Sequence, residues 1–93
     1  MISNAEKNRV EVSIFGKEYI VIGDKPSDYI MKIAEEVDSK MQEIHQINPN
    51  MPQDKIAVMV AINVVDELTR FKEEYQWLLE IIEDEKSSDR IVG

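Results

Sequence analysis

The stretch Ile56–Val65, IAVMVAINVV, decides how this chain folds, because nine of its ten residues are apolar and the tenth is Asn63. It is far shorter than the roughly 20 apolar residues that a membrane-spanning helix needs. It is also too apolar to lie on the surface of a small monomer, and a chain of 93 residues has only a thin core. We therefore expect this stretch to be covered on more than one side.

A long helix is predicted to carry this stretch. Pro52, which is tolerated in the first turn of a helix, marks its start. No glycine or proline follows before Gly93, and the helical pattern continues to about Lys86. At about 1.5 Å per residue, roughly 35 residues span about 50 Å. The residues before Pro52 are enough for only a small head, which is narrower than this length. The far half of the helix therefore requires a partner.

One face of the predicted helix carries an apolar residue at alternating steps of four and three, which is the heptad spacing of a coiled coil. We call these residues the seam: Ala57, Ala61, Val64, Leu68, Phe71, Tyr75, Leu78 and Ile82. If each side chain gains roughly 1.5–3 kcal/mol on burial, an unpaired seam loses more than about 10 kcal/mol. A typical domain has a total stability of that size. We therefore expect the chain to self-associate through the seam.

Asn63 is the polar exception in the apolar stretch, and two interpretations of it remain open. It is either a structural amide that fixes the register of paired helices or a residue that contacts a partner directly. Further along, Trp77, Leu79 and Ile81 lie off the seam and widen the apolar surface. That width is explained either by flanking burial in a dimer or by association beyond a dimer, such as a four-helix bundle.

A shorter amphipathic helix is predicted over residues 27–47, with Ser27 or a neighbour as its cap. Apolar residues recur there at steps of three and four, which traces one helical face. They are Ile30, Ile33, Ala34, Val37, Met41 and Ile44, while Glu35, Glu36 and Asp38 are assigned to the exposed face. The sequence NPNMP at 48–52 ends this helix, because two prolines and two asparagines cannot continue it.

Ahead of this helix, residues 9–22 are predicted to form a β-hairpin. Arg9–Phe15 alternates between apolar and polar residues, and Glu18–Ile22 is rich in β-branched and aromatic residues. Gly16–Lys17 is expected to be a type II′ turn, because glycine in its first position tolerates positive φ. A lone hairpin is marginal in water, so it must lie on another part of the protein or pair with another copy of itself.

The predicted fold class is therefore α+β, with a small head followed by a long coiled-coil helix that self-associates. Residues 1–8 are expected to be a flexible N-terminus. The head spans 9–65 and comprises the hairpin, the helix at 27–47 and the start of the long helix at 52–65. The coiled-coil extension covers 66–86, and 87–93 is expected to be a flexible tail.

Composition excludes several classes of function. The net charge of −8 argues against nucleic-acid binding and against docking on anionic lipid, since both require a basic face. The N-terminus, MISNAEKNRV, lacks the apolar segment of a secretory signal. With no cysteine, neither a disulfide nor a thiolate metal site can form. We expect a soluble cytoplasmic protein that does not insert into a membrane.

The residues of catalysis are also missing. His45 is the one histidine, and without cysteine it makes a poor zinc site. The three glycines are too far apart to form a phosphate-binding loop, and no serine stands in a nucleophile elbow. We expect no enzymatic activity, no catalytic residue, no cofactor and no bound metal.

Three strings of the sequence resemble the ZapA family of bacterial cell-division proteins. VSIFGKEY at Val12–Tyr19 is similar to the family's I-x-G-[KR]-x-Y/L hairpin, and IAEEVDSKMQEI at Ile33–Ile44 to its first helix. DKIAVMVAINVVDEL at Asp54–Leu68 is similar to R/Q-[IL]-A-V-x-x-A-L-N-[IL]-x-x-E-L and is the most specific of the three. The resemblance covers roughly Val10–Glu74, and the family has a coiled-coil extension beyond it.

The resemblance implies a function that spacing alone does not. Members bind FtsZ, the tubulin-like division GTPase, and bundle its protofilaments in the ring at mid-cell. Paired heads bind the filament, and the helical extensions join homodimers into homotetramers. Lys17 matches the basic residue after the family's hairpin glycine, in a region implicated in filament contact, and Asn63 matches the family's asparagine. A lysine at a hairpin tip is explained equally by a solubilising turn residue, so both interpretations of Lys17 remain open. His45 stands where members carry basic residues near the exit of the first helix, which implies a more polar contact there.

The alternative is a generic cytoplasmic coiled-coil adaptor with an unrelated protein partner. Both functions share the head, the seam and self-association, and they differ only in the partner. The expected FtsZ-contacting residues are Lys17, His45 and Asn63. The expected oligomer interface consists of the seam and Trp77.

Overall fold

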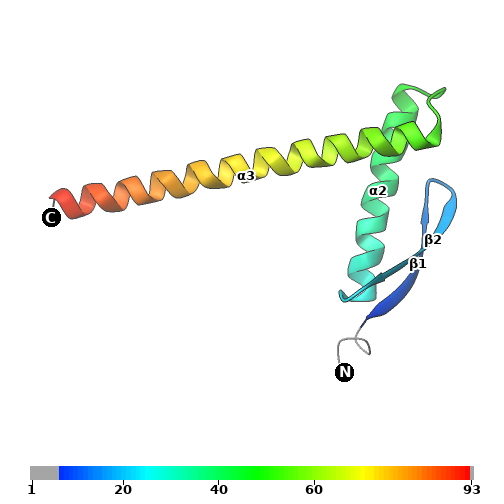
Figure 1. The fold of residues 1–93 in the computed structure, drawn as a ribbon, viewed down its shortest axis with the longest axis horizontal. Helices are drawn as coiled ribbons and strands as arrows, with labels where there is room; N and C mark the ends of the chain where they lie inside the picture. The colour runs from blue at the N-terminus through cyan, green and yellow to red at the C-terminus, as the bar shows by residue number, and fades with distance from the viewer. Residues whose placement is uncertain (1–6, 93) are drawn as a thin grey trace. The chain divides into compact units, whose positions relative to one another are not determined.

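The computed structural model describes residues 7–92, and the side chains of 7–84. Two strands, β1 (Asn8–Ile14) and β2 (Lys17–Gly23), are followed by helix α2 (Ser27–Ile47) and helix α3 (Gln53–Val92) (Figure 1). The chain divides into two compact units, one ending at Val60 and one beginning at Ala61, and α3 belongs to both. The predicted α+β class, with a hairpin, a short helix and a long helix, is confirmed.

The element boundaries lie close to the predicted ones. Helix α2 has the predicted bounds, and α3 starts just after Pro52. Helix α3 extends to Val92, past the end predicted near Lys86. The N-terminal stretch expected to be flexible lies mostly outside the described residues, and its last residue, Asn8, already belongs to β1. None of the helices that the structure describes is long and apolar enough to cross a membrane.

The hairpin turns at Phe15 and Gly16, so the predicted type II′ turn at Gly16–Lys17 is wrong. The strands pair antiparallel, with Ile14 opposite Lys17 next to the turn. Phe15 has a φ of 52° and Gly16 a φ of 78°. Positive φ at both central residues is the geometry of a type I′ turn, whose twist matches that of the strands. The turn lies one residue earlier because Phe15 leaves the strand to pack against the core of the head.

The head has two small apolar clusters. In the first, Val10 and Val12 of β1 pack against Ile30 and Ala34 of α2. In the second, Met41 of α2 packs against the first turns of α3, where Ile56 is fully buried and Val60 nearly so. Because β1 alternates strictly, its apolar side chains face α2 while its polar ones face away.

The ends of α2 are held by backbone groups. The residue before the helix is Pro26, which offers no side-chain cap, so Ser27 is not the cap; its neighbour Asp28 accepts the Tyr29 N–H with its carboxylate at 2.9 Å in the first turn. Ser27 is already inside the helix, and the Pro26 carbonyl accepts the Ile30 N–H at 3.1 Å. At the other end, the Asn48 N–H donates to the Ile44 carbonyl at 2.9 Å.

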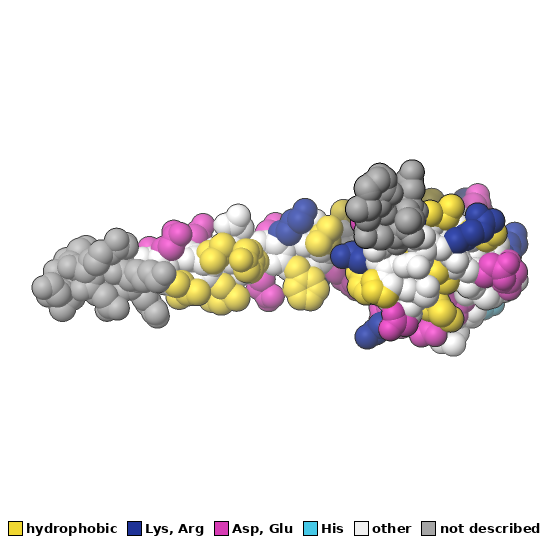
Figure 2. All heavy atoms as spheres, turned by 90° about the horizontal axis from the view of Figure 1, so that it is seen from below, with side chains coloured by type: hydrophobic (Ala, Val, Ile, Leu, Met, Phe, Trp, Pro, Cys, Tyr) yellow, Lys and Arg dark blue, Asp and Glu magenta, His cyan; other side chains and the backbone are white. Residues whose placement is uncertain are grey.

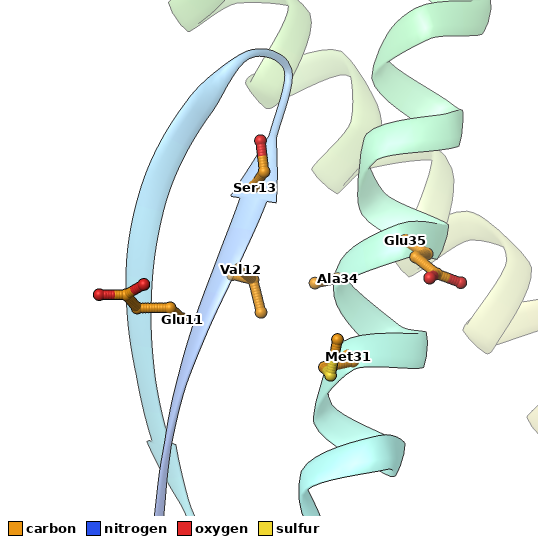
Figure 3. A pocket seen from close by; sticks show the side chains of 6 residues that line it. All are labelled: Glu11, Val12, Ser13, Met31, Ala34 and Glu35. Atoms are coloured by element: carbon orange, nitrogen blue, oxygen red, sulfur yellow. The ribbon is translucent and has the colours of Figure 1, made fainter.

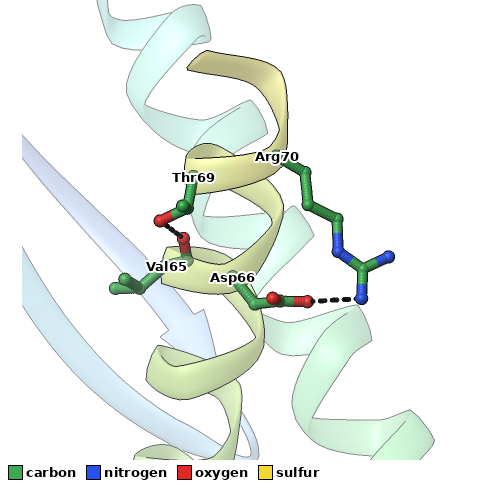
Figure 4. Close-up of polar contacts among 4 residues, drawn as sticks. All are labelled: Val65, Asp66, Thr69 and Arg70. Atoms are coloured by element: carbon green, nitrogen blue, oxygen red, sulfur yellow. Dashed lines mark hydrogen bonds and ion pairs between the residues drawn. The ribbon is translucent and has the colours of Figure 1, made fainter. Parts of the chain in front are cut away.

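Helix α3 carries local polar contacts on its exposed surface (Figure 4). The Thr69 hydroxyl donates to the Val65 carbonyl at 2.8 Å, and Arg70 pairs with Asp66 at 3.1 Å. An exposed pair four residues apart contributes about 0.3–0.5 kcal/mol to a helix. Such contacts are too weak to explain a helix of 40 residues, so we expect a partner chain that covers its exposed apolar side chains to stabilise it.

Candidate interaction surfaces

The seam is uncovered in the single chain. Phe71 is 69% exposed, and the other seam residues are also exposed. Figure 2 shows hydrophobic side chains gathered along α3, with acidic side chains beside them. Ile56 and Val60 face the core of the head, whereas the neighbouring Ala57 and Ala61 are exposed. An exposed apolar stripe of this length is typical of surfaces that bind another chain.

Trp77 lies on a different face of α3 from the seam. With 3.6 residues per turn, it is turned by about 120° from Phe71 around the helix axis. Its side chain is 59% exposed, and Ile81, four residues on, shares its face. Leu79 instead flanks the seam. The end of the helix therefore presents a second, smaller apolar surface outside the heptad stripe.

Asn63 is exposed on α3 in the single chain. It is turned by about 100° from its neighbour Val64 and so lies away from the centre of the seam. Three residues after Val60, it continues the helix face of the buried residues Ile56 and Val60. This position does not resemble a buried asparagine at the centre of a paired seam.

The hairpin tip brings together residues that are far apart in sequence. The Phe15 N–H donates to the Asp38 carboxylate of α2 at 2.6 Å. The Phe15 ring meets the His45 ring edge-on, with centroids 5.6 Å apart and an interplanar angle of 76°. Lys17 follows the turn and is exposed. The turn and the C-terminal half of α2 therefore form one surface of the head.

One of these positions differs from the sequence analysis, and another keeps its predicted role untested. Asp38 was assigned to the exposed face of the helix, but it is half-buried because it reaches the hairpin turn. His45 is half-buried against Phe15, and its expected contact with a partner stays a prediction. Its Nδ1 atom is buried and lacks a hydrogen-bond partner among the atoms that the structure describes. Packing against Phe15 at the hairpin tip thus explains why the His45 ring is half-buried.

A further apolar surface, which sequence reasoning missed, lies on β2. Helix α2 packs mainly on β1, and β2 keeps Tyr19, Ile20 and Ile22 exposed. Beside it, Val21 and Ile33 contribute to an apolar groove of about 260 Å³, whose other lining residues are Ile14, Tyr29, Ile30, Ala34 and Val37. The signal was in the sequence, since EYIVI is apolar on both faces, as strands covered on both sides are.

A second groove, of about 210 Å³, lies between β1 and α2 (Figure 3). Val12 and Ala34 face each other across it, while the carboxylates of Glu11 and Glu35 point away from it and from each other. These acids cannot act as a pair on one substrate. Within residues 7–84, no three histidine, cysteine or acidic side chains cluster as metal ligands would.

The candidate surfaces are exposed and apolar, and comparison with known proteins shows the family to which the chain belongs. The family model described as cell division protein ZapA matches residues 10–91. The chain belongs to the ZapA family. The predicted resemblance is thereby confirmed, and it extends past Glu74 into the second half of α3.

Relatives in the ZapA family match over most of their length. Cell division protein ZapA of Geobacillus sp. (strain WCH70) is 40% identical over 85 residues, covering 91% of this chain and 98% of the relative. The protein of the same name from Halalkalibacterium halodurans is 38% identical, covering 78% of this chain and 80% of the relative. That of Bacillus anthracis is 37% identical, covering 81% and 84%.

A solved structure of the ZapA family shows the same fold. It is a ZapA mutant dimer from Geobacillus stearothermophilus, which is 36% identical to this chain, with a TM-score of 0.67. The match covers 83% of this chain and 90% of the other. That relative is described as a dimer.

Proposed function

We propose that this protein binds FtsZ filaments and crosslinks them into bundles, and that it thereby promotes assembly of the division ring. It would work without catalysis, in the cytoplasm at mid-cell. Membership of the ZapA family supports the role in division, and the uncovered seam of α3 is the observation that carries the crosslinking mechanism.

Self-association is the first step of the mechanism. Two chains pair through their seams, and the surface around Trp77 and Ile81 joins dimers into tetramers. The dimeric relative supports self-association. The seam and Trp77 are the proposed oligomer interface. Pairing removes from water side chains that a single chain leaves exposed, and this burial drives association.

The head makes the filament contact in this proposal. Lys17 presents a flexible positive charge at the exposed tip, and His45 lies under the tip behind Phe15. Asn63 lies on α3 with its amide exposed, where it can donate and accept hydrogen bonds to a partner. A single head binds weakly, but several heads on one oligomer bind with the avidity that high effective concentration provides.

Co-sedimentation with FtsZ, with and without GTP, tests the binding step. The protein should pellet only with GTP-formed polymers. Lys17→Glu should weaken pelleting by at least about tenfold, because reversing a charge at an interface places like charges together. Lys32→Glu, the same change at an exposed site on α2, is the matched control. No pelleting of the wild-type protein across a range of concentration and salt would leave the generic adaptor as the better function.

Electron microscopy of the same mixtures tests the crosslinking step. A seam variant of the whole chain, Phe71→Ala, should still decorate single filaments but form few bundles. If this variant has lost self-association and still bundles as well as the wild-type protein, crosslinking by paired heads is wrong.

A further inference from the structure

We propose that Asp38 is a positioning residue for the filament contact: its carboxylate fixes the hairpin turn and thereby the direction in which Lys17 is presented. This inference rests on the proposed binding of FtsZ at the tip. It is carried by the 2.6 Å hydrogen bond between the Phe15 N–H and Asp38, and by the backbone conformation of Phe15.

The turn needs support from outside its own sequence. Type I′ turns favour asparagine or aspartate before glycine, because these residues tolerate positive φ. Here the position is occupied by Phe15, a bulky residue with a φ of 52°, which is an unfavourable conformation for it. Such a conformation persists only when the surrounding structure fixes it.

Helix α2 supplies that support at two points. Asp38 accepts the Phe15 N–H with a carboxylate, and hydrogen bonds to ionised acceptors are among the stronger ones in proteins. About two helical turns after Asp38, on the same face of α2, His45 packs edge-on against the Phe15 ring. The backbone and the side chain of Phe15 are therefore both held by the same helix.

Lys17 depends on this arrangement through the chain itself. It pairs with Ile14 directly across the turn, so its backbone direction is set by the two residues between them. Without Asp38, Phe15 can relax toward negative φ, which opens the turn and disorders the first pair of the ladder. The Lys17 ammonium then samples many positions, and ordering it again on binding weakens the contact.

The test compares two substitutions of Asp38 in the full chain. Asp38→Leu has a similar shape but no acceptor, whereas Asp38→Asn keeps an oxygen that can accept the same N–H. We expect Asp38→Leu to speed hydrogen exchange of the Phe15 amide, followed by NMR, by at least about tenfold. It should also weaken FtsZ co-sedimentation as much as Lys17→Glu does. Asp38→Asn should keep most of the protection of the Phe15 amide and most of the FtsZ binding. Glu36→Leu, at an exposed acid of the same helix, should change neither the exchange nor the binding.

Two further variants separate positioning from general damage to the head. In the Lys17→Glu background, adding Asp38→Leu should weaken binding no further, because Asp38 acts through Lys17; a merely structural defect would add to the loss. Phe15→Asn creates an Asn-Gly turn that adopts type I′ geometry by itself. In that background, Asp38→Leu should have less effect on amide exchange and on FtsZ binding. If Asp38→Leu alone fails to fold, comparing Phe15→Asn with and without Asp38→Leu tests the same inference.

Each outcome decides a different point. Unchanged exchange of the Phe15 amide in Asp38→Leu would show that the hydrogen bond does not fix the turn and would overturn the inference. Faster exchange with unchanged binding would also overturn it, but would leave FtsZ binding intact. If the wild-type protein itself does not pellet with FtsZ, the proposed function fails and the role of Asp38 in filament contact fails with it.

Discussion

Replacing Phe71 with alanine should weaken self-association strongly while leaving the single chain folded. Phe71 lies at the middle of the seam and is 69% exposed in the single chain. Substitutions at exposed sites usually change stability by less than about 0.5 kcal/mol. Alanine is also a better helix former than phenylalanine, so α3 should keep its helicity. Any large effect of the substitution must therefore come from the partner chain.

The size of the effect follows from the exposed surface. Full burial of a phenylalanine gains about 1.5–3 kcal/mol, so burying the 69% that remains exposed gains about 1–2 kcal/mol per chain. A symmetric dimer contains two copies, which doubles this to about 2–4 kcal/mol. At about 1.4 kcal/mol per factor of ten, the dimer Kd should rise roughly 30-fold to several hundred-fold.

Sedimentation equilibrium over a wide range of protein concentration measures this Kd directly. Glu73→Ala is the matched control, because Glu73 is exposed and lies about 200° around the helix from Phe71. A Kd that Phe71→Ala leaves unchanged would refute the seam as the interface. An equal rise in Kd for Glu73→Ala would refute the assignment of the interface to the seam face of α3.

Three other substitutions test the fold and the apolar stretch. Ile56→Ala should lower stability by about 2–5 kcal/mol, since Ile56 is fully buried, whereas the exposed Val58→Ala should be nearly neutral; urea unfolding at one fixed protein concentration compares them. Gly16→Ala should cost about 1 kcal/mol in the same assay from its φ of 78° alone, because no neighbouring atom lies within 4 Å of the added Cβ. Asn63→Val should keep the helix and a single oligomeric mass in native mass spectrometry, because Asn63 lies away from the centre of the seam. Mixed oligomers would contradict this placement and favour a role of Asn63 in register.

Most of the fold could be predicted from the sequence because its signals are local. The alternation of β1 and the three-and-four spacing of α2 and the seam each follow from the period of one element. The proline-rich break between the helices is equally local. The exposure of the seam in the single chain could also be predicted, because its apolar length exceeds what a small head can cover.

The hairpin tip could not be predicted in the same way. Whether Phe15 adopts positive φ depends on a hydrogen bond to Asp38, 23 residues away in the sequence. The acid pattern of α2 placed Asp38 on the exposed face, because periodicity does not show which polar side chain meets a turn. The exposed apolar surface of β2 was missed for a related reason: the sequence shows two apolar faces but not which strand α2 covers.

The apolar stretch at 56–65 now shows why folding and association should be coupled. Its first face, with Ile56 and Val60, is covered inside the head. Its second face carries Ala57, the first residue of the seam, and is exposed. A third face, with Val58, Ile62 and Val65, is also exposed. A single chain thus covers one of three apolar faces, and the small clusters of the head provide little stability by themselves. A partner that binds only the folded chain adds its binding free energy to folding, so stability should rise with protein concentration.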